Sequence, residues 1–431
     1  MLGKIFGALV VFLVLTILIS VVLLMVSLVP NLLDPKFKAT VPFILRQCVS
    51  GLNSTALLAI PMFVFSGVIM AKGGISQKLF NVFAYFFGDR TGGMPCAVVV
   101  TCLFYGAISG SAPATTAAVG SMTIPFLVSM GYDIVFCAAL VATAGGLGVI
   151  IPPSIPFILY CMGSNSSIGA IFIAGILPGI LIGIALMIYA HFYCRIKGEN
   201  KELINKSVHE LRSKGFFALF KDSVWAIISP VFILGGIYGG YVTPTEAAVV
   251  SVIYSLFISL CVYKTATIKG LWDITAEAVS TYAPILFILA SAAAFGRVLT
   301  LTQAPQNIAI AMGEMFTSKV SMLIAINVFL LFVGMIMDTG PAILILTPIF
   351  HPIITKLGID PIHFGVIMIC NLAIGFITPP IGNNLYVAST LTKVPVMTIA
   401  RRSAPMGVVF LIVLMFITFV PWISLALLGR G

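Results

Sequence analysis

The chain turns at Gly106-Ala-Ile-Ser-Gly-Ser-Ala-Pro-Ala-Thr-Thr116, a stretch of small and hydroxyl-bearing residues, and then interrupts an apolar run at Gly148-Val-Ile-Ile-Pro-Pro-Ser154. Both features return in the second half as Gly334-Met-Ile-Met-Asp-Thr-Gly-Pro341 and Gly375-Phe-Ile-Thr-Pro-Pro380. Inside a lipid bilayer, an interrupted helix leaves backbone groups unpaired at a cost of several kcal/mol each, unless protein, an ion or a solute satisfies them. Two matched interruptions therefore decide the fold and indicate where the molecule binds something.

The composition is that of a membrane protein. Of 431 residues, 60% are hydrophobic and 8% are charged, whereas about a quarter of the residues of a soluble domain are charged. The run from Ile5 to Val29 contains no charge and is long enough to cross roughly 30 Å of hydrocarbon. No small-x-small cleavage site clearly follows it, so we expect a retained membrane helix, with a long signal peptide as the alternative.

The charge and the cysteines exclude several classes of protein. The basic residues behind the net charge of +10 are scattered in short connections, which fits positive-inside topology and argues against a nucleic-acid partner. The eight cysteines and four histidines are dispersed, so neither a disulfide framework nor a zinc site is indicated. Neither His-Glu-x-x-His nor Gly-x-Ser-x-Gly occurs, and we expect no enzymatic activity.

Two polar segments set the expected topology. Asp34 to Lys38, followed by Arg46, is interpreted as a cytoplasmic turn. The longest polar segment, Arg195 to Asp222, divides the molecule in two. Within it, 208–212 and 216–220 combine apolar and charged residues as an amphipathic helix on the cytoplasmic surface would, and a solvated linker is the alternative.

The motif Thr243-Pro-Thr-Glu246 predicts a helix start between the expected helices at about 224–241 and 245–263. The Thr243 hydroxyl is expected to cap the third helical amide while Glu246 reaches back, with proline at the first helical position. We therefore interpret Glu246 as a capping residue in preference to a solute contact.

The two halves match as repeats. Over residues 125–178, a constant shift of 227 brings four prolines onto prolines, where composition predicts about 0.2. The matched prolines are Pro125, Pro152, Pro153 and Pro178 with Pro352, Pro379, Pro380 and Pro405. The turns just upstream match at 228, Pro113 with Pro341, as a one-residue insertion would allow. The sequence therefore predicts two structural repeats.

The repeats are expected to have opposite orientations. The first ends at Arg195, on the basic segment that we place in the cytoplasm, whereas Lys393 and Arg401-Arg402 precede the last expected helix. That helix, at about 406–428, should therefore leave the cytoplasm. Inverted repeats with discontinuous helices are an architecture of secondary transporters, whose binding sites lie at the interruptions.

The turns offer ligands of two kinds. A turn between two short helices leaves carbonyls free at one terminus and amides free at the other. The carbonyls suit a small cation, and the amides and hydroxyls suit an anionic solute. For each serine or threonine alone, helix packing is the simpler explanation, but the doubled arrangement favours a binding role for the set.

Two charged residues stand in apolar surroundings. A carboxylate such as Asp338 is costly within a membrane turn and is usually functional, as a cation ligand or a proton site. Arg297, in an apolar run, can attract a carboxylate or can simply reach an interface near its helix end, and both interpretations stay open.

Four motifs resemble the large membrane subunit of tripartite ATP-independent periplasmic (TRAP) transporters, and the resemblance spans nearly the whole chain. They are Gly-Ala-Ile-Ser-Gly-Ser-Ala at 106–112, Gly-Val-Ile-Ile-Pro-Pro-Ser at 148–154, Tyr-Gly-Gly-Tyr-Val-Thr-Pro-Thr-Glu-Ala-Ala at 238–248 and Ile-Thr-Pro-Pro-Ile-Gly at 377–382. The chain looks most similar to members that carry sialic acid, although dicarboxylate members share every motif quoted.

The resemblance implies sodium coupling by two or more ions, a small four-helix membrane subunit (Q) and a soluble periplasmic substrate-binding protein (P). Because no small-subunit sequence precedes Met1, the chain looks like the unfused form. The implied location is the bacterial inner membrane, which the chain crosses several times. The implied function is sodium-coupled import of an organic acid, sialic acid or a C4-dicarboxylate. A self-sufficient ion-coupled carboxylate transporter is the alternative.

Carried onto this sequence, the family pattern implies one sodium at each turn together with the following interruption, and a substrate between the turns. For sodium, the implied residues are Ser109, Gly110, Gly148, Ile151, Pro153, Gly334, Asp338, Thr339, Thr378 and Pro379. For the substrate, the candidates are Ser111, Ala112, Ser154, Gly340, Asn383 and Arg297.

The expected fold is an all-α polytopic membrane protein. It combines inverted-topology repeats, two re-entrant helical hairpins and two broken helices in an elevator-type transport domain that moves against a scaffold. The expected units are scaffold helices at 1–88, the first repeat at 89–194, a cytoplasmic amphipathic connector at 195–223, further scaffold helices at 224–315 and the second repeat at 316–431.

Overall fold

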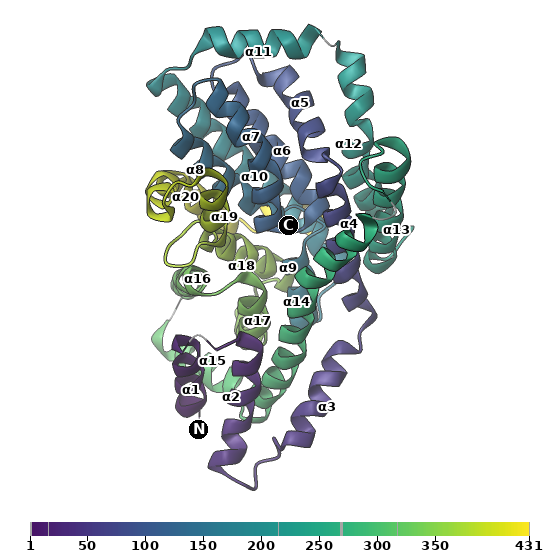
Figure 1. The fold of residues 1–431 in the computed structure, drawn as a ribbon. Coiled ribbons are helices and arrows are strands. Elements are labelled where there is room, and N and C mark those ends of the chain that lie inside the picture. Colours follow the sequence, from purple (N-terminus) through teal and green to yellow (C-terminus); the bar gives the residue numbers. More distant parts are fainter. Residues whose placement is uncertain (1, 16, 214, 268–269, 317, 431) are drawn as a thin grey trace.

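The computed structural model describes residues 2–15, 17–213, 215–267, 270–316 and 318–430, and over these ranges it is built from helices with no strand (Figure 1). Within the described ranges, seven helical segments are long and apolar enough to cross a membrane. They are Thr55–Lys72, Ile168–Lys197, Phe216–Tyr238, Pro244–Val262, Gly270–Leu301, Lys319–Ile336 and Val396–Phe419. The prediction of an all-helical polytopic membrane protein is confirmed at this level.

The N-terminal apolar run is two helices, not the single helix expected. Helix α1 (Leu2–Val14) ends before α2 (Ile19–Leu33) begins, and the two pack against each other. An uncharged run satisfies the length rule whether or not its helix is continuous, so hydropathy alone does not reveal the break. The connection from α2 to α3 (Val41–Leu52) lies at the end of the molecule opposite α11 (Lys201–Ser213) (Figure 1). Both of these polar segments were expected on the cytoplasmic side, but the structure places them at opposite ends.

One group of helices packs around α4 (Ala59–Lys72), which follows the short helix η1 (Thr55–Leu58). Its neighbours are α13 (Pro244–Phe257), continued by η3 (Ile258–Val262), and α14 (Gly270–Leu301). Between α4 and α13, the hydroxyls of Ser66 and Ser255 lie 2.7 Å apart. The long helix α14 also packs on α2, α3 and α17 and so runs along much of the molecule (Figure 1).

The predicted capping box at the start of α13 is confirmed. The Thr243 hydroxyl accepts from the Glu246 amide at 3.3 Å, and the Glu246 carboxylate accepts from the Thr243 amide at 2.8 Å. The Glu246 carboxylate is therefore engaged in capping its own helix.

Each repeat contains a helical hairpin, an interrupted helix and a closing helix. The first repeat consists of α6 (Gly93–Ser109), α7 (Ala112–Ser129), α8 (Ile134–Gly145) with η2 (Gly146–Val149), α9 (Ile155–Ser164) and α10 (Ile168–Lys197). The second consists of α16 (Lys319–Ile336), α17 (Thr339–Lys356), α18 (Pro361–Gly375), α19 (Asn383–Thr392) and α20 (Val396–Phe419). The interrupted helices α8 and α18 begin at matching caps, in which Asp133 and Asp360 each accept from two backbone amides.

The repeat shift holds throughout. Adding 227 to the first residues of α6, α7, α8, α9 and α10 gives positions within one residue of the starts of α16, α17, α18, α19 and α20. The one-residue insertion expected from Pro113 and Pro341 is therefore not needed. After the shift of 227, Pro113 falls one position before Pro341. Both prolines lie in the first turn of their helices, α7 and α17, where proline is tolerated, so the offset does not require an insertion.

The two interrupted helices run antiparallel. Tyr160 lies in α9, the later part of the first interrupted helix, and its hydroxyl donates to the carbonyl of Pro361 at the start of α18, at 2.6 Å. The Asn384 amide, after the second interruption, donates to the Ala142 carbonyl, before the first interruption, at 2.8 Å. Late residues of each helix thus lie beside early residues of the other, as an inverted repeat requires.

The long polar segment contains one amphipathic helix. Helix α11 lies across one end of the molecule and buries Ile204, Val208 and Leu211 on one face (Figure 1). It packs on α5 (Ile75–Phe87). Residues 216–220 belong instead to α12 (Phe216–Tyr238). The remaining helices are α15 (Ala304–Met315), α21 (Trp422–Leu425) and η4 (Ala426–Leu428).

Candidate functional site

The tip of the first hairpin gathers oxygen atoms around Gly148. The Ser109 and Thr115 hydroxyl oxygens lie 2.8 Å apart, and the Thr115 hydroxyl donates to the Ser111 carbonyl at 2.8 Å. A Cβ at Gly148 would lie 2.4 Å from the Thr115 hydroxyl and 2.8 Å from the Ser111 carbonyl. Only glycine at this position lets the interruption approach the tip so closely.

The first interruption also contacts the tip through Gly110. This residue has φ +60°, and a Cβ there would lie 2.9 Å from the Pro153 carbonyl oxygen. The Ile155 amide donates to the Gly110 carbonyl at 3.4 Å. The Gly110 and Pro153 carbonyls therefore lie where the tip meets the interruption, and oxygen atoms of this kind are ligands that a small hard cation prefers.

Three other candidate residues of the first repeat have local structural contacts. The buried Ser154 hydroxyl donates to the Val149 carbonyl at 2.5 Å and caps α9 by accepting from the Phe157 amide. The Ile151 side chain packs against α10 at Gly179. Ala112 is buried at the start of α7.

The second tip presents Asp338. This residue precedes α17, but its side chain does not cap the helix, and its carboxylate accepts from the Asn383 amide at 3.2 Å. The tip lies against the second interruption, because a Cβ at Gly375 would lie 2.2 Å from the Gly334 carbonyl oxygen. A carboxylate with one neutral donor beside it keeps lone pairs for a cation.

The second interruption is tied to the hairpin through its backbone. The Ile381 amide donates to the Met335 carbonyl at 3.2 Å. The Thr378 hydroxyl donates to the Ile374 carbonyl in its own helix at 2.8 Å, which leaves the oxygen of that hydroxyl able to accept or to coordinate. Next to it, Pro379 and Pro380 prevent the helix from continuing regularly.

Both tips face a single cavity of about 350 Å³. Its wall contains Gly110 and Ser111 from the first tip and Asp338, Thr339 and Gly340 from the second. Residues more than 220 positions apart in sequence thus meet at one place. The candidates Ser109, Gly148, Pro153, Thr378, Pro379 and Asn383 do not line this cavity. Ser109 lines a neighbouring cavity, and the others lie at the interruptions or beside the second tip.

Helix α14 closes the cavity and was not singled out in the sequence. Thr281, Pro284, Ile285 and Ile288 line it. The only sequence signal was a proline inside a long apolar run, which does not by itself point to a cavity. Arg297, on the same helix, is exposed and does not line the cavity. It lies near the end of α14, as the interface interpretation describes, and the structure does not bring it to the other candidates.

The site contains a carboxylate, hydroxyls and carbonyls. Among the described residues, no group of three or more histidine, cysteine or acidic side chains gathers as a transition-metal site would require. Oxygen atoms alone suit alkali and alkaline-earth cations.

Comparison with known proteins gives the family. Residues 6–423 match the model of the tripartite ATP-independent periplasmic transporter, DctM component. The isethionate TRAP transporter permease protein DctMQ of Oleidesulfovibrio alaskensis is 41% identical over 90% of this chain, and the chain spans 60% of its length. The C4-dicarboxylate TRAP transporter large permease protein DctM of Pseudomonas aeruginosa is 41% identical over 86% of each chain.

A sialic acid relative is less similar. The sialic acid TRAP transporter large permease protein SiaM of Vibrio cholerae is 35% identical over 90% of this chain and 91% of its own length. Because the isethionate and dicarboxylate relatives are each 41% identical, the expectation that sialic acid members are the most similar is not supported.

The fold also resembles solved transporters. The YdaH transporter of Alcanivorax borkumensis superposes with a TM-score of 0.65 at 14% identity, over 97% of this chain and 99% of that chain. MtrF of Neisseria gonorrhoeae, described as illuminating a class of antimetabolite efflux pumps, superposes with a TM-score of 0.64 at 14% identity, over 97% and 95%. At this identity the likeness shows the fold alone. From the family match and the relatives together, the chain belongs to the DctM family of tripartite ATP-independent periplasmic transporters.

Proposed function

We propose that this chain is the large membrane subunit of a sodium-coupled importer of an organic acid in the bacterial inner membrane. It would act with a small four-helix membrane subunit and a soluble periplasmic binding protein that delivers the solute. The observation that carries the proposal is the meeting of two hairpin tips at one cavity, each tip backed by an interrupted helix.

Two sodium ions would bind behind the tips. One would lie among the Ser109 and Thr115 hydroxyls and the carbonyls of Gly110 and Pro153, whose mutual approach Gly148 permits. The other would lie near Asp338, between the second tip and the Thr378 interruption. Backbone carbonyls freed by interrupted helices are ligands that sodium-coupled transporters use.

The solute would bind in the cavity between the tips. Its volume of about 350 Å³ suits a small molecule, and Ser111, Thr339 and Gly340 supply polar and backbone groups on its wall. The relatives' printed names cite isethionate, C4-dicarboxylates and sialic acid. All three are organic anions, which defines the proposed substrate class.

Transport would follow an elevator mechanism. The two repeats, 89–194 and 316–431, would form the moving transport domain with re-entrant hairpins. Residues 1–88 and 224–315 would form the scaffold, and 195–223 would connect the two. The cavity supports this division because its walls come from both hairpins and from α14, a helix of the proposed scaffold. Sodium drives the solute if each binds better in the presence of the other.

The test is uptake into proteoliposomes that contain both membrane subunits, with the cognate binding protein outside. Succinate, N-acetylneuraminate and isethionate would be supplied separately. We expect one of these anions to accumulate under an inward sodium gradient and not under a matched potassium gradient. Uptake indifferent to sodium would refute the coupling. Full uptake without the binding protein would favour the alternative, a self-sufficient carboxylate transporter.

A further inference from the structure

A second cavity, of about 560 Å³, adjoins the one between the tips. The two share four lining residues: Ser111, Ile155, Thr281 and Ile285. The second cavity extends from the tip of the first hairpin along α7 to Ser121 and reaches the start of α5 at Gln77. It therefore lies between the first hairpin on one side and helices α4 and α14 on the other.

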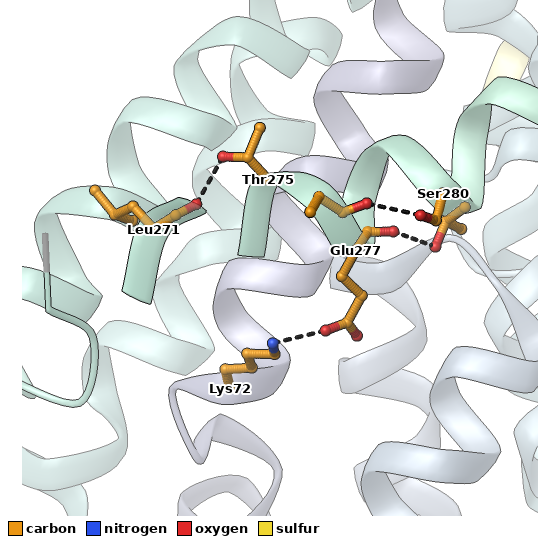
Figure 2. A network of polar contacts seen from close by, with 7 residues as sticks. Lys72, Leu271, Thr275, Glu277 and Ser280 are labelled. Carbon is orange, nitrogen blue, oxygen red and sulfur yellow. Dashed lines mark hydrogen bonds and ion pairs between the residues drawn. The ribbon is translucent and has the colours of Figure 1, made fainter. Parts of the chain in front are cut away.

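This cavity contains one ion pair. Among the residues that the structure describes, Lys72, at the end of α4, and Glu277, on α14, are the only charged residues that line it, and their Nζ and carboxylate oxygen lie 2.7 Å apart. Their side chains are 44% and 53% exposed. Figure 2 shows the pair bridging two helices, whereas the nearby hydroxyls of Thr275 and Ser280 bond to carbonyls of their own helix, α14.

The same wall holds an unused hydrogen-bond donor. Tyr105 of α6 is fully buried and lines this cavity, and among the described residues its hydroxyl has no hydrogen-bond partner. Buried polar groups normally have partners, and an exception calls for an explanation. The Lys72 ammonium group matches the charge of a carboxylate or sulfonate, and the buried Tyr105 hydroxyl is a further hydrogen-bond donor on a lining residue.

We propose that this second cavity is a further anion site, in which Lys72 exchanges the Glu277 carboxylate for the acid group of the solute. The inference rests on the proposed function, because it assumes that the solute is an organic anion. Half-exposed ion pairs are weakly held, so an incoming anion can displace Glu277 at little cost. Glu277 then competes for Lys72 and drives the solute out, which prevents the cavity from trapping it.

A purely structural role for the Lys72–Glu277 ion pair predicts a different result. If Lys72 and Glu277 only fasten α4 to α14, neutralising either residue should weaken the protein and affect anion binding in the same direction. If Lys72 binds the anion and Glu277 competes with it, Lys72→Gln should weaken binding whereas Glu277→Gln should strengthen it.

The experiment uses Ser121→Cys as a reporter on the purified full-length chain. Ser121 is exposed on the cavity wall, and its labelling by an anionic methanethiosulfonate is followed against the parent chain, which gives the background from native cysteines. The probes are succinate, N-acetylneuraminate and isethionate with sodium present, and glycerol is the neutral control. The measured quantity is the probe concentration that halves the labelling rate.

We expect this half-protecting concentration to rise about two- to fivefold in Lys72→Gln and to fall by a similar factor in Glu277→Gln, as expected for a half-exposed charge pair. Tyr105→Phe should also raise it. Lys78→Gln is the matched control, because Lys78 lies over the Tyr263 ring and does not line the cavity.

Changes in the same direction in Lys72→Gln and Glu277→Gln, or no change in either, would overturn the anion site. The proposed function is tested separately by uptake into proteoliposomes containing the unmodified chain. If that uptake is sodium-driven while the half-protecting concentrations of the two variants do not change in opposite directions, only the second anion site is wrong. If no probe is carried and none protects Ser121→Cys, both proposals are wrong.

Discussion

Gly375 is a position where one methyl group decides whether a hairpin can lie against an interruption. A Cβ there would lie 2.2 Å from the Gly334 carbonyl oxygen, a backbone atom that cannot rotate away. We expect Gly375→Ala to lower stability by about 1–3 kcal/mol, as overpacking does. The measurement is the melting temperature in detergent.

Gly235→Ala is the control for this substitution. Gly235 lies inside α12, and a Cβ there would have no neighbour within 4 Å. We expect this variant to match or exceed the parent, since alanine favours helix more than glycine does. A melting temperature for Gly375→Ala equal to that of Gly235→Ala would show that the close approach is not important.

Ser109 and Asp338 are the side chains most directly assigned to sodium. Because each would coordinate an ion directly, we expect Ser109→Ala and Asp338→Asn each to raise the half-saturating sodium concentration for uptake about tenfold, equivalent to about 1.4 kcal/mol. Expression should stay normal. Ser129→Ala is the control, because Ser129 is exposed at the far end of α7 and bonds within its own helix. Unchanged sodium dependence in both variants would favour the packing interpretation.

At the scale of elements, Glu199 fastens the base of the first hairpin to the connector. Its side chain is 1% exposed and accepts from the Tyr132 hydroxyl at 2.6 Å and from the Gly92 amide at 3.0 Å, and it pairs with Lys201 at 3.0 Å. Glu199→Ala would leave buried donors unpaired, at about 1–3 kcal/mol each.

We therefore expect Glu199→Ala to melt several degrees below the parent. Glu202 is exposed in the first turn of α11, in the same connector, and gives the control variant Glu202→Ala. This control should have the melting temperature of the parent. Equal melting temperatures for the two variants would mean that the connector does not stabilise the hairpin.

The sequence predicted the elements whose signals are local. Prolines at fixed spacing predicted the interruptions and the 227-residue repeat, and Thr243 with Glu246 predicted a helix start that is confirmed. The division of the N-terminal run into α1 and α2 was missed because a run without charges satisfies the length rule whether or not its helix is continuous.

The sequence also predicted part of the candidate site. Polar and glycine-rich turns pointed to Ser111, Asp338 and Gly340, which the structure places at one cavity. Thr281 and Ile285 line the same cavity from α14, and sequence reasoning missed them because which face of a long apolar helix meets the cavity depends on tertiary packing. For the same reason the sequence left two interpretations of Arg297 open, and the structure places this arginine away from the cavity.

At the scale of the whole molecule, the proposed elevator mechanism requires the first hairpin to move against α14. Bridging Ser111→Cys to Thr281→Cys with a short bifunctional thiol reagent would join the two across the cavities that both residues line. We expect uptake to stop on bridging and to return on reduction.

The matched control joins two helices that should not move apart. Ser66 and Ser255 lie in α4 and α13, both in the proposed scaffold, with hydroxyls 2.7 Å apart. Bridging Ser66→Cys to Ser255→Cys should leave uptake intact. Full uptake by a transporter bridged between Ser111→Cys and Thr281→Cys would contradict the elevator movement.

In the proposed mechanism, sodium binds to backbone groups left unpaired by two opposed helix interruptions. Hydrogen exchange of the purified chain, compared in sodium and in potassium at equal ionic strength, tests this claim without knowledge of the substrate. We predict sodium-specific protection confined to residues 106–116, 146–155, 334–341 and 375–384, the tips and the interruptions. Equal exchange in the two salts at all four segments would contradict the account.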